Sequence, residues 1–179
     1  MSFSRAKAVS ALAAPDYLLM RKVNRWPAPR WIRVWMLAST RGGDGWFWGL
    51  CGLIVLLTHD AARFAAIIAS ALATATGILI FITVKKAVGR KRPCHIEPHC
   101  WATLLPPDRF SFPSGHSITA FAIAVSLGLF YPAIFPGLLF LAVSVALSRI
   151  LLGMHFLTDV LAGAALGTVL GYASYALVA

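Results

Sequence analysis

Long apolar runs are the feature of this sequence that most restricts how it can fold. Residues 64–84 contain no Asp, Glu, Lys or Arg, and neither do residues 160–179. Both runs reach the length of about 20 residues that a helix needs to cross a bilayer. Over the whole chain 59% of the residues are hydrophobic and 12% are charged, whereas soluble domains have about 45–50% and about 25%. These proportions exclude an ordinary soluble protein, a disordered chain and a polar nucleic-acid-binding domain.

Three further apolar runs extend this pattern to a bundle. They cover residues 45–57, 117–131 and 133–147. Each is long enough to cross a bilayer only when the polar residues at its ends are counted. We therefore predict an all-α membrane protein, a helical bundle of five or six transmembrane helices, in which residues 45–57 form the shortest span.

The amino-terminal part of the chain has a different composition. Trp31 and Trp35 are four residues apart, so they share one face of a helix, and arginines alternate with the tryptophans here. This combination is typical of a helix at a membrane surface, where indole rings lie among the headgroups; a solvated basic tail is the alternative. We predict an interfacial amphipathic region at residues 1–44 and a transmembrane domain at residues 45–179.

Alternation of the five spans across the membrane brings many polar residues to one side. The segment 85–113 follows the second span and the segment 148–159 follows the fourth, so both lie on the side of residue 45. The residues gathered there are Lys85, Arg92, Ser114, His116, Arg149, His155 and Asp159. Alone, Lys85 would be a span-end anchor and Arg149 a snorkelling residue. Because ionisable groups near a membrane are costly and usually functional, the combination predicts a site.

The cations at this side predict a binding site for an anion, and phosphate fits it. Arginine offers a planar fork of donors that matches phosphate oxygens, and lysine adds a point charge. Ser114 and Gly115 begin a helix after a proline, where free backbone N–H groups also favour phosphate. The predicted phosphate-binding residues are Lys85, Arg92, Ser114, Gly115 and Arg149.

Two histidines and one aspartate add the groups that phosphoryl transfer requires. His155 and Asp159 are four residues apart and share a helix face. An Asp beside an imidazole fixes its tautomer and leaves the other nitrogen free to attack or to take a proton. His116, from another helix, could act as an acid towards a leaving oxygen. Because the cations would neutralise charge as a metal ion does, we expect neither a metal nor another cofactor.

At these residues the sequence resembles the type 2 phosphatidic acid phosphatase superfamily of integral-membrane lipid phosphatases. The first family motif, Lys, six residues, Arg-Pro, matches residues 85–93. The second, Pro-Ser-Gly-His, matches residues 113–116. The third, Ser-Arg, five residues, His, three residues, Asp, matches residues 148–159. All three are complete and in order, and the resemblance covers roughly residues 45–179.

The resemblance implies a mechanism and a substrate class. His155 would attack phosphorus to form a phosphohistidine, Asp159 would orient His155, and His116 would protonate the leaving group. The substrate would be a lipid phosphate or diphosphate, with undecaprenyl diphosphate and phosphatidylglycerophosphate as leading candidates and a lipid A 1-phosphate as a third. The related vanadium haloperoxidases are soluble, and the apolar runs argue against that branch. A non-catalytic protein that binds anionic lipids is the competing hypothesis.

The expected partners are the lipid phosphate substrate and membrane lipids, with no nucleic acid and no obligatory protein partner. Every Lys and Arg except Arg63 falls on the predicted site side, and the positive-inside rule would place that side in the cytoplasm. Several of these cations belong to the site, however, and bacterial members of the family mostly act on the outer side of the cytoplasmic membrane. We therefore expect a multi-pass protein of the bacterial inner membrane with a periplasmic site.

A second group of possible ligands lies between the first two motifs. The potential ligands of residues 94–100 are Cys94, His95, Glu97, His99 and Cys100. Three interpretations remain open: a Cys94–Cys100 disulfide in an oxidising compartment, a metal site, or neither of the two.

Overall fold

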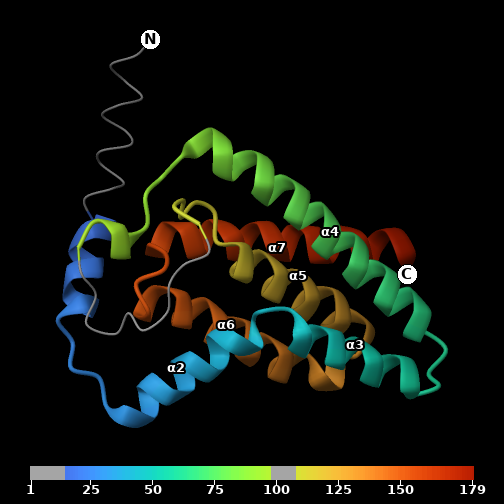
Figure 1. Ribbon diagram of the computed structural model, residues 1–179. Coiled ribbons are helices and arrows are strands. Elements are labelled where there is room, and N and C mark those ends of the chain that lie inside the picture. The colour runs from blue at the N-terminus through green and yellow to red at the C-terminus, as the bar shows by residue number, and fades with distance from the viewer. Residues whose placement is uncertain (1–14, 98–107) are drawn as a thin grey trace.

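The computed structural model describes residues 15–97 and 108–179, and in these residues helix is the only extended regular structure. The larger helices are α2 (Arg30–Gly42), α3 (Trp46–Leu57), α4 (Arg63–Val88), α5 (Gly115–Phe130), α6 (Phe135–Leu151) and α7 (Leu157–Val178) (Figure 1). Residues 15–24 are also helical, and short 3-10 turns lie at Pro93–His95 and Pro132–Ile134. The prediction of an all-α fold is confirmed.

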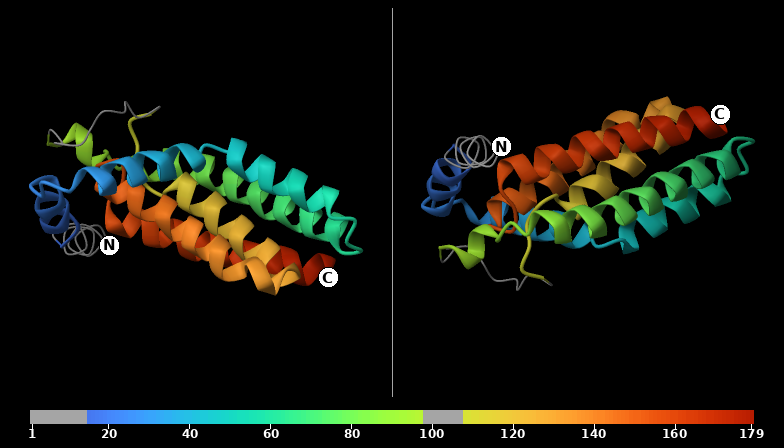
Figure 2. Two further views of the ribbon diagram at one scale, coloured as in Figure 1. Left: turned by 90° about the horizontal axis from the view of Figure 1, so that it is seen from below. Right: turned by 90° about the horizontal axis from the view of Figure 1, so that it is seen from above.

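Three helices of the described chain are long and apolar enough to cross a membrane: α4, the stretch Pro132–Leu151 that contains α6, and α7. The apolar helices α3 and α5 are shorter. The 12 residues of α3 extend only about 18 Å, which is less than the bilayer core of about 30 Å. Helix α2 precedes α3 across the break at residues 43–45, and the two follow one another along the bundle (Figure 2).

Helix α5 lies between α4, α6 and α7 and carries much of the buried core. Glycines on α7 bring it close to α5. A Cβ atom added at Gly163 would lie 2.6 Å from the Ser114 carbonyl oxygen, and one at Gly171 would lie 2.7 Å from the Ala122 carbonyl oxygen. Small residues at four-residue spacing permit such close packing. The contact also places the beginnings of α5 and α7 side by side, where the Ser114 N–H donates to the Asp159 carbonyl oxygen at 3.1 Å.

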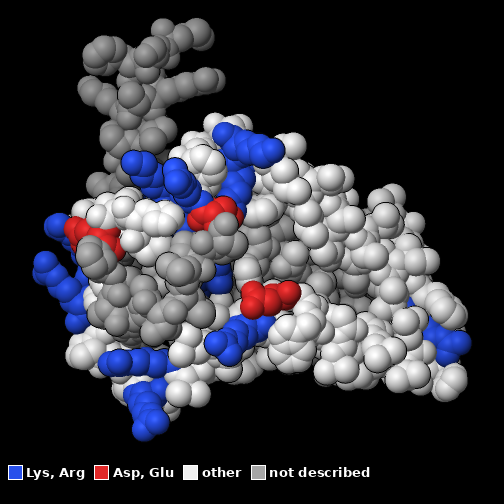
Figure 3. Space-filling model, viewed as in Figure 1, with Lys and Arg blue, Asp and Glu red and all other residues white. Residues whose placement is uncertain are grey.

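The bundle has an apolar outer surface and one charged end. Large exposed side chains follow α4, among them Phe64, Ile68, Leu72 and Leu79, as is expected of a surface that faces lipid. In Figure 3 the Lys, Arg, Asp and Glu residues gather over one end of the molecule, and the surface between the ends is almost uncharged. The charged end is the one to which Lys85 of α4 and Arg149 of α6 belong.

Helix α2 is amphipathic and packs on α6. Its exposed face carries Trp31 and Trp35, whose rings stack at 6.4 Å between centroids. Trp35 also stacks on Phe140 of α6 at 5.8 Å. The opposite face of α2 buries Met36 and Thr40. The buried face of α2 places Thr40 against Arg149 of α6, and the interfacial role of residues 1–44 stays a prediction.

Candidate active site

The polar residues predicted from the three motifs converge at the charged end of the bundle. A cavity of about 510 Å³ opens there. Of the predicted residues, the cavity wall includes Lys85, Arg92, Gly115, His116, Arg149 and His155. Ser114 and Asp159, both 0% exposed, lie behind this wall. The expectation that distant segments meet on one side of the membrane helices therefore agrees with the geometry.

His155 lies in the loop between α6 and α7 and has a defined tautomer. Its Nδ1 lies 2.6 Å from the Ser111 carbonyl oxygen, and a carbonyl can only accept, so Nδ1 carries the proton. Its Nε2 lies 3.1 Å from Nη1 of Arg92, which can only donate, so Nε2 carries a lone pair. Complete burial lowers the pKa of His155 to about 4. The ring is therefore neutral at pH 7, with a nucleophilic nitrogen beside a guanidinium.

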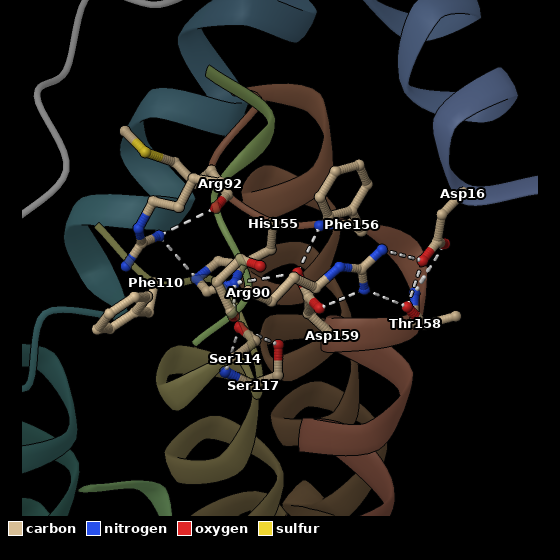
Figure 4. Close-up of polar contacts among 12 residues, drawn as sticks. Asp16, Arg90, Arg92, Phe110, Ser114, Ser117, His155, Phe156, Thr158 and Asp159 are labelled. Atoms are coloured by element: carbon tan, nitrogen blue, oxygen red, sulfur yellow. Dashed lines mark hydrogen bonds and ion pairs between the residues drawn. The ribbon is translucent and has the colours of Figure 1, made fainter. Parts of the chain in front are cut away.

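Asp159 lies at the start of α7 next to this ring but does not take its Nδ1 proton. The distance from its Oδ2 to Nδ1 of His155 is 3.8 Å, longer than a hydrogen bond. Oδ2 instead accepts from the Phe156 N–H at 2.8 Å, and Oδ1 accepts from Nη1 of Arg90 at 2.8 Å (Figure 4). In this structure the Ser111 carbonyl orients His155, while Asp159 supplies a nearby negative charge and fixes the loop.

Arg90 was not identified from the sequence, although it connects several parts of the site. It donates to Asp159 and to Thr158 Oγ1 at 2.8 Å each. Its second nitrogen donates to Asp16 Oδ2 at 2.8 Å, and the guanidinium lies 4.0 Å from the centre of the Phe156 ring. Asp16, which is 4% exposed, also accepts from the Thr158 N–H at 3.2 Å. The amino-terminal helical residues 15–24 are thereby tied to the beginning of α7 (Figure 4).

Asp108 is a second residue that the motifs do not contain. Its carboxylate accepts from Nζ of Lys85 at 2.5 Å and from Nη2 of Arg92 at 3.1 Å. Burial alone would raise the pKa of Asp108, but these two cations outweigh it and hold the pKa below its usual value. Carboxylate and phosphate oxygens suit the same cations, so a phosphate that approached Lys85 and Arg92 would compete with Asp108.

The remaining predicted cation, Arg149, is 5% exposed. Its Nη1 donates to Thr40 Oγ1 of α2. Its Nε is buried without a hydrogen-bond partner in the part of the chain that the structure describes. An unpaired buried donor costs free energy, so an anion that reached this nitrogen would be stabilised.

His116 and its neighbours at the start of α5 face the same cavity. Nε2 of His116 lies 2.8 Å from Oδ1 of Asp44, a residue of the turn between α2 and α3. Ser114 is the N-cap of α5, and its hydroxyl oxygen accepts from the Ser117 hydroxyl at 2.9 Å. In both contacts with Ser117 the Ser114 hydroxyl acts as the acceptor, so the capping role does not use its own proton. The absent side chain of Gly115 leaves room for Phe81, whose ring would be 3.1 Å from a Cβ at that position.

The cavity continues from the polar end into an apolar groove between helices. Its apolar wall includes Trp48 of α3, Ile78 and Ile82 of α4, and Ile118 and Ile123 of α5. Ile78 and Ile82 are 43% and 45% exposed, so the groove is open along the lipid-facing side of α4. This shape suits a molecule with a charged head and an apolar tail.

The second group of possible ligands is only partly described. Cys94 is half-buried, and its N–H donates to the Gly153 carbonyl oxygen at 3.1 Å. Cys100 and His99 lie outside the described residues, so the structure does not choose among a Cys94–Cys100 disulfide, a metal site and neither. Glu97 accepts from Nη2 of Arg21 at 2.7 Å and from the Tyr17 hydroxyl at 2.6 Å. Among residues 15–97 and 108–179 no three His, Cys, Asp or Glu side chains form a group that could hold a metal ion.

Comparison with known proteins identifies the family. Residues 61–179 match the sequence model of the PAP2 superfamily. The chain belongs to the PAP2 superfamily. It is 35% identical over 144 residues to decaprenylphosphoryl-5-phosphoribose phosphatase of Mycobacterium tuberculosis H37Rv, covering 76% of this chain and 77% of that protein. The resemblance to the type 2 phosphatidic acid phosphatases is thus confirmed.

Two solved structures of PAP2 proteins share the fold. The phosphatidylglycerolphosphate phosphatase of Bacillus subtilis superimposes with a TM-score of 0.75 at 24% identity, covering 93% of this chain and 86% of that one. LpxE of Aquifex aeolicus gives a TM-score of 0.73 at 25% identity, covering 87% and 92%. The activity rests on the family match and on the decaprenylphosphoryl-5-phosphoribose phosphatase relative, which together show that this PAP2 protein is a membrane lipid phosphatase.

Proposed function

We propose that this PAP2 phosphatase hydrolyses a lipid phosphate or diphosphate through a phosphohistidine on His155. The observation that supports this most directly is the neutral His155 ring, whose Nε2 carries a lone pair next to Arg92 at 3.1 Å. Lys85 and Arg149 line the same cavity. A nucleophile and the cations that stabilise phosphoryl charge are therefore within one pocket.

The proposed reaction has two displacement steps. In the first, Nε2 of His155 forms a bond to phosphorus, the phosphorus–oxygen bond to the lipid breaks, and His116 gives a proton to the leaving oxygen. In the second, water gives a proton to His116 and attacks phosphorus, the phosphorus–nitrogen bond breaks, and phosphate leaves. Asp159, at the start of α7, supports His155 by accepting from the neighbouring Phe156 N–H, and its charge stabilises the ring when it becomes positive.

The proposed phosphate-binding groups would act together on the phosphoryl oxygens. Lys85, Arg92 and Arg149 would neutralise negative charge in the transition state. The backbone N–H of Gly115 would contribute the positive end of helix α5. Ser114, whose own N–H donates to the Asp159 carbonyl oxygen, would contribute its hydroxyl proton. Because this set supplies the neutralising charge, we propose that activity requires no metal ion.

The apolar groove supports a substrate with a long hydrocarbon tail. The named relatives act on a decaprenyl lipid and on a glycerophospholipid. We propose a lipid of one of these two kinds, with undecaprenyl diphosphate and phosphatidylglycerophosphate as the first compounds to assay, and a lipid A 1-phosphate as the alternative. The tail would enter from the lipid-facing side of α4, with the phosphate at the charged end of the bundle.

The cellular setting is part of the same proposal. Residues 1–44 would lie at the membrane interface, and residues 45–179 would form the phosphatase domain of a multi-pass protein of the bacterial inner membrane. The site would face the periplasm, as the resemblance to bacterial members of the family implies. The proposed partners are the lipid substrate and the surrounding lipids, with no obligatory protein partner.

Phosphate release from a panel of these lipids, measured in detergent with EDTA present, tests the proposal. We expect wild-type activity to survive EDTA and the His155→Ala variant to lose about 10³-fold or more. His59→Ala is the matched control, because His59 is exposed at the opposite end of the bundle. A folded His155→Ala variant with normal activity, or the absence of an acid-labile phosphoenzyme during turnover, would contradict the proposal.

A further inference from the structure

The turn between α2 and α3 brings a carboxylate to the proposed acid, His116. Asp44 Oδ1 lies 2.8 Å from Nε2 of His116, although 72 positions separate the two residues in the sequence. Glycines on both sides of Asp44 make this approach possible. A Cβ atom at Gly43 would lie 3.0 Å from Cδ2 of His116 and 2.8 Å from Cγ1 of Val145, and Gly45 has a φ angle of 103°. The turn is thus shaped to fit against this histidine ring.

The surroundings of His116 otherwise disfavour a positive charge on its ring. The ring shares its cavity with the cations of Arg149, which comes from α6, Arg92, which follows α4, and Lys85 of α4. His155, which is neutral, and Asp108, which is paired with Lys85 and Arg92, also face this cavity. Asp44 is the carboxylate in direct contact with the ring. An opposite charge within about 4–6 Å favours the charged form of an ionisable group.

We propose that Asp44 is a positioning residue that holds His116 in the protonated form from which it donates to the leaving oxygen. This proposal rests on the proposed function, since it assigns a partner to its acid. The Asp44 carboxylate accepts from Nε2–H, and the second proton of the imidazolium is on Nδ1. That Nδ1 proton passes to the lipid oxygen as the phosphorus–oxygen bond breaks. The neutral ring keeps its Nε2–H bond to Asp44, and Nδ1 later takes a proton from the attacking water.

Asp44 lies outside residues 61–179, which match the PAP2 superfamily, and it belongs to none of the three motifs. Thr40, which accepts from Arg149, comes from the same segment. The segment before residue 45 therefore contributes to the proposed site, because its side chains contact two of the proposed site residues.

The test compares Asp44→Asn, Asp44→Glu and wild type on two kinds of substrate. The alkoxide leaving group of a lipid phosphate is poor and needs a proton from an acid. The 4-nitrophenolate group of 4-nitrophenyl phosphate leaves readily without one. We expect Asp44→Asn to lower kcat for the lipid about 10- to 100-fold and for 4-nitrophenyl phosphate by less than about threefold. Asp44→Glu should recover part of the loss on the lipid, because it restores a carboxylate.

A pH profile with the lipid alone provides a second measurement. Removal of the Asp44 charge should move the alkaline limb of kcat to lower pH by about one unit. His116→Ala should show the same preference for the activated substrate, and Asp60→Asn, an exposed aspartate at the far end of the bundle, should behave as wild type. Equal losses on both substrates with an unchanged alkaline limb would mean that Asp44 only shapes the turn, and wild-type behaviour of Asp44→Asn would also overturn the proposal.

The two proposals fail in different ways. Normal activity of a folded His155→Ala variant contradicts the proposed function itself. An inactive His155→Ala variant combined with a fully active Asp44→Asn variant contradicts only the role of Asp44. Thermal unfolding of each variant in detergent separates loss of the fold from loss of chemistry.

Discussion

The carboxylate of Asp108 accepts from the Lys85 ammonium at 2.5 Å. Arg92 donates to the same carboxylate at 3.1 Å. In the absence of substrate, the protein thus neutralises its own anion site. A phosphate dianion must compete with Asp108 for these two cations, so Asp108 lowers the affinity of the site for phosphate.

Substitution of Asp108 by Asn should therefore strengthen phosphate binding. The neutral amide retains the shape but competes less well for Lys85 and Arg92, so the inhibition constant of inorganic phosphate should fall by about three- to tenfold. The change should be measured as product inhibition of the lipid reaction. Asp60→Asn, which removes a charge far from the site, is the control. A higher inhibition constant in Asp108→Asn would show that Asp108 assists phosphate binding.

Arg90 should be important for both stability and activity. Its removal leaves two nearly inaccessible carboxylates without their cation, because the side chains of Asp16 and Asp159 are only 3% and 0% exposed. Loss of one partner of a buried ion pair costs about 3–5 kcal/mol. Arg90→Ala should thus lower the unfolding temperature in detergent and reduce kcat, whereas Lys86→Ala, at an exposed position of α4, should do neither. An unaltered unfolding temperature would count against this role.

The pH dependence of stability should report on His155. Its pKa falls from 6.5 to about 4 on burial, so between these values the unfolded chain binds a proton that the folded protein does not. The contribution of His155 to the free energy of unfolding should therefore fall as the pH is lowered from 6.5 to 4, by about 3 kcal/mol, and this contribution should level off below pH 4. Thermal unfolding across this range, compared between wild type and His155→Gln, measures the effect. His95→Gln, at an exposed histidine, should keep the wild-type slope.

These residues illustrate what the sequence could and could not predict. The apolar runs predicted helices α3 to α7, three of which are long enough to cross a membrane, and alternation of spans predicted that Lys85 and Arg149 lie at one end. Both inferences depend on local composition and spacing, which sequence shows directly. Arg90 could have been noticed because it lies two positions before Arg92. In an extended segment, side chains two positions apart point to the same side. Nothing in the sequence indicated which carboxylate it would bind.

The contacts of the amino-terminal region could not be predicted for a different reason. Asp16 reaches Thr158 and Asp44 reaches His116 across separations of 142 and 72 positions. Such pairs depend on how the segment 15–44 packs against α6 and the loop before α7, and no periodicity encodes that packing. Ser114 shows the opposite case: its position at the helix start was correctly inferred, and there its hydroxyl oxygen is the acceptor that caps α5.

Close packing of α7 on α5 should be sensitive to a single methyl group. A Cβ at Gly163 would lie 2.6 Å from the Ser114 carbonyl oxygen and 3.1 Å from Cβ of Ser117, and neither group can move without shifting the start of α5. Gly163→Ala should destabilise the protein by about 1–3 kcal/mol and reduce activity, as measured by unfolding in detergent and phosphate release. Gly49→Ala is the matched control, because no heavy atom lies within 4 Å of its added Cβ. Equal effects of the two substitutions would contradict the packing argument.

The apolar groove should determine the affinity for the lipid tail. Ile78 lines the groove and is 43% exposed, so Ile78→Trp should fill part of the path that the tail follows. We expect KM for a long-tailed lipid phosphate to rise about tenfold, because the lost burial of a few methylene groups at about 0.8 kcal/mol each suffices. Hydrolysis of 4-nitrophenyl phosphate, which has no tail, should stay unchanged. Leu79→Trp is the matched control, since Leu79 is adjacent and 67% exposed but does not line the groove. If both substitutions raise KM equally, the tail binds elsewhere on α4, and if neither does, it does not enter between α4 and α5.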